Sequence, residues 1–167
     1  MKYIKRITFL VLLVSTAFVQ LHAQGYKLPK YEKFKLKNGL TVYLMEQKEV
    51  PVISVSAILP AGAIYDGEKA GLATLTATAL KHGTKRYPKE KLDEDLDFIG
   101  ASVSTYANKE AAGLSARFAS KDRDKALEIV KEILLDPVFD AAEFEKEKKR
   151  MLVSLEQQKE SPRSVIS

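Results

Sequence analysis

The scarcity of metal-ligating and nucleophilic side chains limits the chemistry of this chain. Its 167 residues contain no Cys and only two His, His22 and His82. The absence of Cys excludes disulfides, thiolate-bound zinc, iron–sulfur clusters and thiol catalysis. A pair of imidazole ligands would need both histidines in the mature protein, so the fate of the N-terminus decides which metal chemistry is available.

The N-terminal segment has the pattern of a secretory signal peptide. Three basic residues precede an apolar run over residues 7–19, which is shorter than the about 20 residues that span a bilayer. Ala23 offers the small residue expected before a cleavage point. We expect removal of residues 1–23, export to the periplasm or the outside of the cell, and no membrane span after cleavage. An uncleaved anchor is the alternative.

Cleavage would leave His82 as the only histidine and would lower the net charge. The full chain carries 27 basic and 22 acidic residues, and the mature chain 24 and 22, so the net charge falls from +5 to +2. This balance gives no support to nucleic-acid binding. An apolar content of 46% and a charged content of 29% are ordinary for a globular protein. Residues 24–167 are expected to form a single domain that cannot supply two imidazole ligands.

Hydrophobic periodicity predicts three strands, two helices, two strands and two helices. Alternating apolar residues on both sides of Asn38-Gly39 predict a hairpin with a two-residue type I′ turn. The order predicts an α+β domain, with helices packed on a mainly antiparallel sheet. The later elements are expected over residues 52–59 (strand), 71–81 and 88–100 (helices), 103–107 and 114–118 (strands), and 122–135 and 140–160 (helices).

The same periodicity predicts which helical residues face the core. In the first, third and fourth helices these are Leu72, Leu75, Ala79 and Leu80; Leu127, Val130, Ile133 and Leu134; and Phe144, Met151, Leu152 and Leu155.

Several short segments, taken in their order and spacing, resemble the insulinase–pitrilysin family of peptidases, the inverted zincins. The resemblance covers the mature chain and implies the fold of the insulinase and mitochondrial-processing-peptidase-like metallohydrolase domain. The segments that carry it are Leu36-Lys37-Asn38-Gly39-Leu40-Thr41-Val42, Ala70-Gly71-Leu72-Ala73, His82-Gly83-Thr84, Leu96-x-x-x-Gly100-Ala101, Asp136-Pro137-x-Phe139 and Phe144-Glu145-Lys146-Glu147-Lys148.

The zinc motif of that family is missing from this chain. Active members carry His-x-x-Glu-His directly after Gly-Leu-Ala, because two His one helical turn apart bind zinc and the Glu activates the metal-bound water. Here the three positions are Thr74, Ala77 and Thr78. A further Glu completes the zinc site in the family, and its position falls near Ser154, with Leu155 or Glu156 as alternatives. The resemblance therefore implies no catalytic residue and no zinc bound by this chain.

Ordinary structural roles account for most of the polar residues near that motif. We expect the hydroxyls of Thr74 and Thr78 to bond back to helix carbonyls rather than to act as nucleophiles. His82 is expected to occupy a capping or turn position, with a relic ligand or a base as the alternative. Residues 143–150 are expected to form a solvated helix face.

A peptide-binding edge is the functional feature that could persist without zinc. In active relatives, the strand matching residues 101–107 is a sheet edge that pairs with an extended substrate peptide. The resemblance then assigns peptide contacts to Ser102, Ser104 and Tyr106. A covered or interior strand is the alternative.

The favoured interpretation is a non-catalytic subunit or domain of an exported zinc-dependent proteolytic assembly. This chain would contribute chamber wall and peptide contacts, while a homologous zinc-bearing subunit supplies hydrolysis. The alternatives are a peptide-binding scaffold without a proteolytic partner, and an active zinc metallopeptidase whose ligands lie outside this chain. Because relatives continue beyond the position of residue 167, we expect the domain to be incomplete at its C-terminus and residues 24–167 to be marginally stable alone.

Overall fold

The chain separates into two compact units. The computed structural model describes residues 29–160, so the expected signal peptide lies outside the described residues. The first unit ends at Lys48 and holds strands β1 (Glu32–Lys35) and β2 (Thr41–Leu44); the second begins at Glu49 and holds the other elements.

The first unit contains the predicted β-hairpin, but with a different turn. The Leu36 N–H donates to the Leu40 carbonyl at 2.8 Å, and the Gly39 N–H donates to the Leu36 carbonyl at 2.9 Å. These bonds leave a three-residue loop, so the predicted two-residue turn is wrong. Gly39 has a φ of +90°, and Asn38 Oδ1 accepts a hydrogen bond from the Leu40 N–H at 3.1 Å. A turn followed by a left-handed glycine is the usual way to close a three-residue hairpin.

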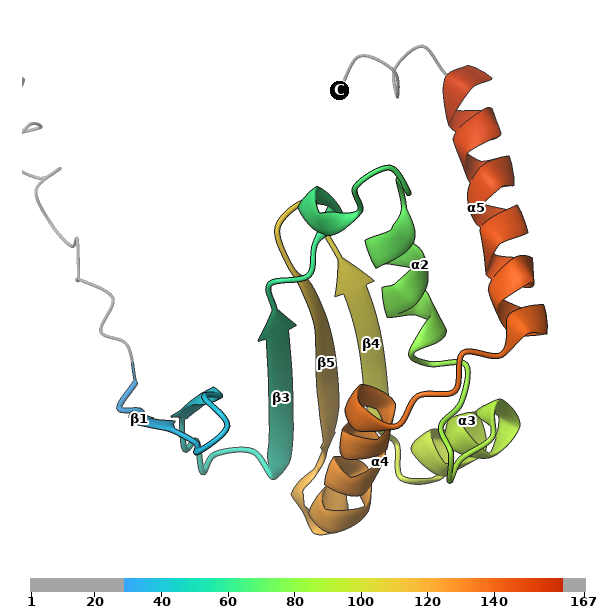
Figure 1. The fold of residues 1–167 in the computed structure, drawn as a ribbon. Coiled ribbons are helices and arrows are strands. Elements are labelled where there is room, and N and C mark those ends of the chain that lie inside the picture. The colour runs from blue at the N-terminus through green and yellow to red at the C-terminus, as the bar shows by residue number, and fades with distance from the viewer. Residues whose placement is uncertain (1–28, 161–167) are drawn as a thin grey trace, which may run out of the picture. The chain divides into compact units, whose positions relative to one another are not determined.

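The second unit is built on a three-stranded sheet, whose antiparallel pairing agrees with the prediction. The strand order is β3-β5-β4, so β5 is central (Figure 1). The strands are β3 (Val52–Leu59), β4 (Ser102–Ala107) and β5 (Ala112–Ala119).

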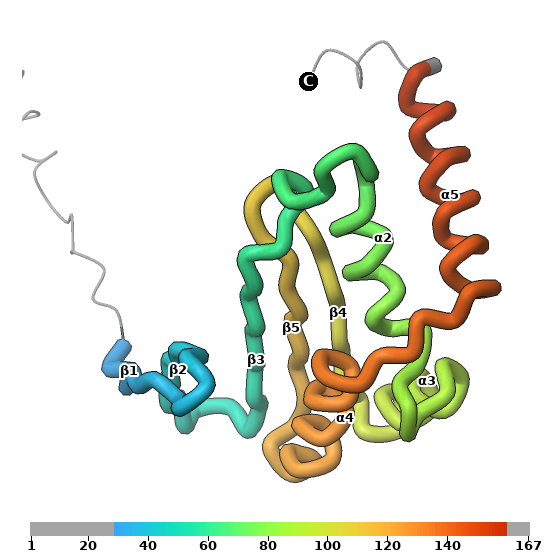
Figure 2. The backbone as a smooth tube through the Cα atoms, in the orientation of Figure 1, coloured from blue at the N-terminus to red at the C-terminus, as the bar shows by residue number. Residues whose placement is uncertain are grey.

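Helices supply the rest of the core, which lies against one face of this sheet. The helices are α2 (Leu72–Ala79), α3 (Lys89–Phe98), α4 (Arg123–Leu135) and α5 (Ala141–Glu160), with 3-10 turns η1 (Ala63–Tyr65) and η2 (Ser120–Asp122). Leu114, Ala116 and Phe118 of β5 are buried together with residues of α3 and α4. Helix α2 contacts both β4 and α5 (Figure 2). The predicted α+β class is confirmed.

Helix α4 buries Val130 and Ile133 as predicted, but its buried face is shifted away from Leu127. Leu127 was expected to face the core but is 41% exposed, whereas Ile129 is fully buried. Ala126, Ile129, Val130 and Ile133 form a continuous i, i+3, i+4, i+7 stripe, which is the geometry that one helix face requires.

Helix α2 also turns small residues inward. Ala79 is buried as predicted, but Leu72, which was also predicted to face the core, is exposed, and Ala77 is buried in addition. Small side chains let the backbone of a helix approach its neighbours closely, and α2 packs against β4 and β5 on one side and α5 on another. Hydrophobic periodicity favoured the larger Leu72 as a core residue and did not reveal that small residues of α2 pack closely against its neighbours.

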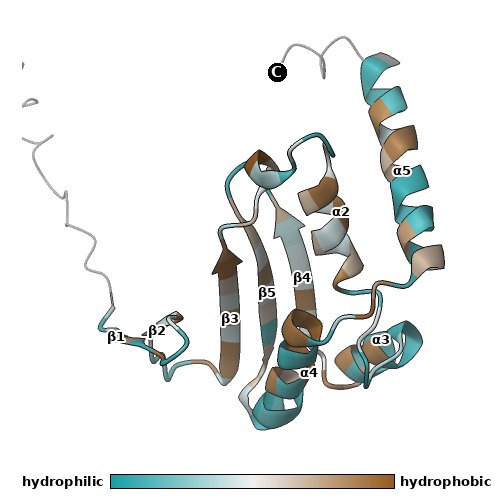
Figure 3. Cartoon of the chain, in the orientation of Figure 1, coloured by the Kyte–Doolittle hydropathy of each residue, from teal (hydrophilic) through white to brown (hydrophobic). Residues whose placement is uncertain are grey.

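The predicted apolar stripe of α5 is buried only in part. Phe144 and Met151 are half-buried, but Leu152 and Leu155 are exposed. Figure 3 shows apolar residues at the start of this largely polar helix and again in its second half. No described helix is long and apolar enough to cross a membrane.

The first turn of α5 is tied to the start of α3 by charge. Lys89 Nζ lies 3.3 Å from Glu143 Oε2, and Lys146 also pairs with this carboxylate. The two ammonium groups, that of Lys146 foremost, hold the pKa of Glu143 below its ordinary value. Asp140 Oδ1 accepts a hydrogen bond from the Glu143 N–H at 2.9 Å and so caps the helix.

A buried carboxylate holds the N-terminus of α2. Asp66 Oδ2 accepts a hydrogen bond from the Gly71 N–H and Oδ1 one from the Ala73 N–H, both at 2.8 Å. Amides at a helix N-terminus lack partners within the helix, and a negative charge there stabilises the helix by interacting favourably with the positive end of its dipole. Gly71, with a φ of +91°, would place a Cβ only 3.0 Å from the Met151 methyl group. Asp66 and Met151 therefore fix the start of the helix that carries the motif positions.

This cap predicts a defined loss on removal of the Asp66 carboxylate. Asp66→Ala should lower the free energy of unfolding by about 1–2 kcal/mol, since two helix amides lose their acceptor. Amide hydrogen exchange in the first turn of α2 should accelerate. Glu68→Ala is the matched control, because Glu68 is an exposed carboxylate in the same loop; its effect should stay within about 0.5 kcal/mol. Equal effects of the two substitutions in urea titrations would contradict the assigned cap.

Candidate functional site

The motif positions lie on α2 and carry no metal-binding side chain. Thr74 is exposed, Thr78 is half-buried and Ala77 is 3% exposed. Thr78 Oγ1 donates to the Thr74 carbonyl at 3.0 Å, which is the expected back-bonding of a helix hydroxyl. This hydroxyl is therefore engaged with its own helix.

His82 lies against α5 rather than in a ligand set. Its N–H donates to the Ala79 carbonyl at 3.0 Å, in the turn after α2, which agrees with the expected turn role. The side chain is 7% exposed, and Nε2 lies 3.9 Å from Glu147 Oε1. Nδ1 has no hydrogen-bond partner within the described part of the chain. One imidazole and one carboxylate do not make a zinc site.

The position expected for the family's third zinc ligand also offers no metal-binding side chain at Ser154. Ser154 is an exposed residue of α5, and a serine hydroxyl is not among the usual zinc ligands. Across residues 29–160, no group of three or more His, Asp or Glu side chains is placed to hold a metal ion. The residues present therefore do not fit the zinc ion that the family motif would bind.

Strand β4 lies at an edge of the sheet. Among the described residues it pairs with β5 alone, and α2 packs next to it (Figure 1). Within the described residues β4 is therefore not an interior strand of this sheet.

The register shows which backbone groups of β4 point outward. The Asn108 N–H donates to the Ala111 carbonyl at 2.8 Å, so this pair is hydrogen-bonded across the two strands. Hydrogen-bonded pairs alternate along an antiparallel ladder, so every second residue of β4 bonds to β5. Those residues are Ser102, Ser104 and Tyr106, and the residues that direct their N–H and C=O groups to the free edge are Val103, Thr105 and Ala107.

The side chains of the predicted peptide contacts share the other face of the sheet. Ser102, Ser104 and Tyr106 are exposed, and Ser104 Oγ donates to the Ser115 carbonyl at 3.5 Å. The Tyr106 hydroxyl lies 2.6 Å from the position that a Cβ on Gly113 would occupy. The ring of Tyr106 thus lies across the central strand.

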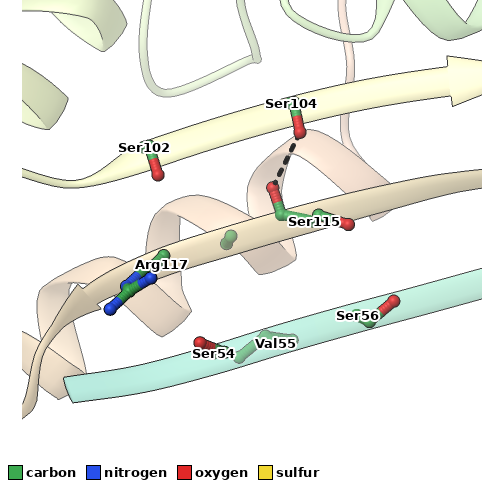
Figure 4. A pocket seen from close by; sticks show the side chains of 8 residues that line it. Ser54, Val55, Ser56, Ser102, Ser104, Ser115 and Arg117 are labelled. Carbon is green, nitrogen blue, oxygen red and sulfur yellow. Dashed lines mark hydrogen bonds between the residues drawn. The ribbon is translucent and has the colours of Figure 1, made fainter.

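A shallow hollow of about 260 Å³, lined mostly by serines and Arg117, crosses the three strands on this face. We call this surface the serine face. Arg117 of β5 lies between Ser54 of β3 and Ser102 of β4, and Ser115 lies in the same way between Ser56 and Ser104 (Figure 4). Sequence reasoning missed Arg117. The alternation in β5, with Leu114, Ala116 and Phe118 inward, was the signal that put Arg117 on the opposite face.

Comparisons with known proteins agree with this fold. The chain is 30% identical over 139 residues to cytochrome b-c1 complex subunit 1, mitochondrial, of Bos taurus, covering 83% of this chain and 29% of that protein. It is 29% identical over 133 residues to an uncharacterized zinc protease of Rickettsia felis, covering 79% of this chain and 32% of that protein. The chain thus spans about a third of the length of these relatives.

A solved structure shows the same fold. The crystal structure of a peptidase M16 inactive domain from Pseudomonas fluorescens superposes with a TM-score of 0.78 at 28% identity, covering 81% of this chain and 34% of that one. The profile of the family "Insulinase (Peptidase family M16)" matches residues 41–167. That interval contains β2, the three-stranded sheet and all four helices, including the motif positions on α2. The chain therefore belongs to the insulinase family, peptidase family M16.

Proposed function

We propose that this chain is a non-catalytic member of the insulinase family that acts in an exported, zinc-dependent proteolytic assembly. One observation carries the proposal: α2 keeps its place beside an edge strand but presents Thr74, Ala77 and Thr78 at the motif positions. The chain would supply peptide contacts and part of the chamber wall. A homologous subunit that bears zinc would supply hydrolysis.

The similar proteins support this division of labour. The Pseudomonas fluorescens structure is described as an inactive domain of peptidase M16, and the Bos taurus relative is by name a subunit of a larger complex. A non-catalytic chain of this fold within an assembly therefore has parallels in the family. Export rests on the signal-peptide pattern of residues 1–23.

Peptide binding in this proposal uses the backbone of β4. The N–H and C=O groups of Val103, Thr105 and Ala107 can pair with an extended peptide, as in other cases of strand addition. These backbone bonds provide affinity that depends little on the peptide's sequence. Alternate peptide side chains would then lie beside Ser102 and Ser104 on the serine face. A peptide-binding scaffold without a peptidase partner would use the same edge, and the presence of a zinc-bearing partner distinguishes the two functions.

The first prediction concerns the isolated chain. The purified full chain should contain far less than one zinc ion per chain by metal analysis. It should show no chelator-sensitive cleavage of a fluorogenic peptide mixture, because its motif positions offer no imidazole or carboxylate. One tightly held zinc per chain, with cleavage abolished by a chelator, would contradict the proposal. It would favour the alternative of an active metallopeptidase whose zinc ligands lie outside residues 1–167.

The second prediction tests the β4 edge. Thr105→Pro removes an outward N–H and adds a ring at the edge, but it breaks no bond to β5, so the fold should persist. Binding of a fluorescein-labelled seven-residue peptide of alternating Thr and Val, with Gln at its centre, should weaken about tenfold or more in fluorescence anisotropy.

Ser56→Pro is the control on the opposite edge. The Ser120 N–H donates to the Pro51 carbonyl at 2.9 Å, and alternation from that pair directs the Ser56 N–H away from β5. Ser56→Pro should leave the affinity unchanged. If Ser56→Pro alone weakens binding, the peptide binds at β3, and the assignment to β4 is wrong. Circular dichroism of both variants checks that the fold is retained.

A further inference from the structure

The serine face carries one charged side chain, which has no partner among the described residues. Arg117 is the only charged residue in β3, β4 and β5. Within residues 29–160, the guanidinium of Arg117 forms no ion pair and no hydrogen bond. An arginine without a partner on a polar, solvent-open surface is free to pair with an anion from another molecule.

The register places Arg117 within reach of a peptide at the β4 edge. Arg117 lies opposite Ser102, and a peptide strand added to β4 would be the second strand from β5. The backbone of this peptide would therefore lie about 9.6 Å, or two strand spacings, from the backbone of β5. The side chain of a peptide residue paired with Ser102 would project on the serine face, because paired residues share a face of the sheet. Ser102 is small, so an extended arginine and an acidic side chain can meet across it.

We propose that Arg117 makes the β4 edge selective for extended peptides that carry Asp or Glu at the position paired with Ser102. This inference rests on the proposed peptide-binding function and names its substrate class. The Arg117 guanidinium supplies a charge-assisted, planar donor pair for the carboxylate, and the Ser102 hydroxyl is placed to supply another donor. Backbone pairing with Val103, Thr105 and Ala107 remains the general source of affinity.

The same surface disfavours basic peptides. The three strands contain no Asp or Glu, so a Lys or Arg at the same peptide position would face only the like charge of Arg117. Discrimination therefore has an attractive and a repulsive component.

Three labelled peptides test the selectivity on the full chain. Each has seven residues of alternating Thr and Val, and the central residue is Glu, Gln or Lys. At low salt the Glu peptide should bind about fivefold more tightly than the Gln peptide, and the Lys peptide should bind most weakly. The difference should shrink in about 0.5 M salt, where charges on an exposed surface are screened.

Variants of Arg117 connect the ranking to this side chain. Arg117→Gln should bind the three peptides equally, whereas Arg117→Lys should preserve the ranking. If wild-type protein binds all three peptides equally, the selectivity is contradicted and the proposed peptide binding is supported. If the ranking survives in Arg117→Gln, Arg117 is not its source and the inference is wrong. If none of the peptides binds, the proposed function fails and the selectivity fails with it.

Discussion

The register of β5 against its two neighbours is the constraint on which the second unit depends. Leu114, Ala116 and Phe118 of this central strand face the helices, and Ser115 and Arg117 face the opposite side. A slip of one residue would expose the apolar set and turn Arg117 into the core. The burial of Leu114 and Phe118 thus fixes which backbone groups of β4 point to the free edge, and it fixes the position of Arg117 between two serines.

Helix α2 shows how a family element can keep its place after its zinc ligands are replaced. Its N-terminus is held by the Asp66 carboxylate, its buried Ala77 and Ala79 permit close packing, and Met151 of α5 lies against Gly71. These contacts involve none of the side chains that bind zinc in active members. The fold of this region is therefore maintained by capping and packing, which explains how the edge strand beside α2 can remain in place without a metal.

Much of this fold could be predicted from the sequence, because strand alternation and helix caps are local signals. The strand over residues 52–59 was predicted at its observed bounds, and the helix that contains Leu92 and Leu96 was also predicted. The predictions failed where contacts with neighbouring elements determine which residues are buried. Leu127 and Ile129 both fit a helical period, and only the packing of α4 on the sheet selects Ile129. The hairpin turn depended on a hydrogen bond from the Leu40 N–H to Asn38.

The site was predictable where it rests on residue identity and hidden where it rests on register. Thr74, Ala77 and Thr78 could be assigned from their spacing after Gly71-Leu72-Ala73. The outward groups of Val103, Thr105 and Ala107 follow from the hydrogen bond between Asn108 and Ala111, which no sequence pattern reveals. The position of Arg117 between two serines became visible only from the register of β5 with β3 and β4.

The most direct test of the account is to identify what the chain binds in its own cells. The tagged full chain, expressed at its native level, would be purified under gentle conditions and its partners quantified by mass spectrometry. The account predicts a stoichiometric homologue that carries His-x-x-Glu-His and one zinc ion. Recovery of the chain without such a homologue, at native abundance and after cross-linking, would contradict its role in a zinc-dependent assembly.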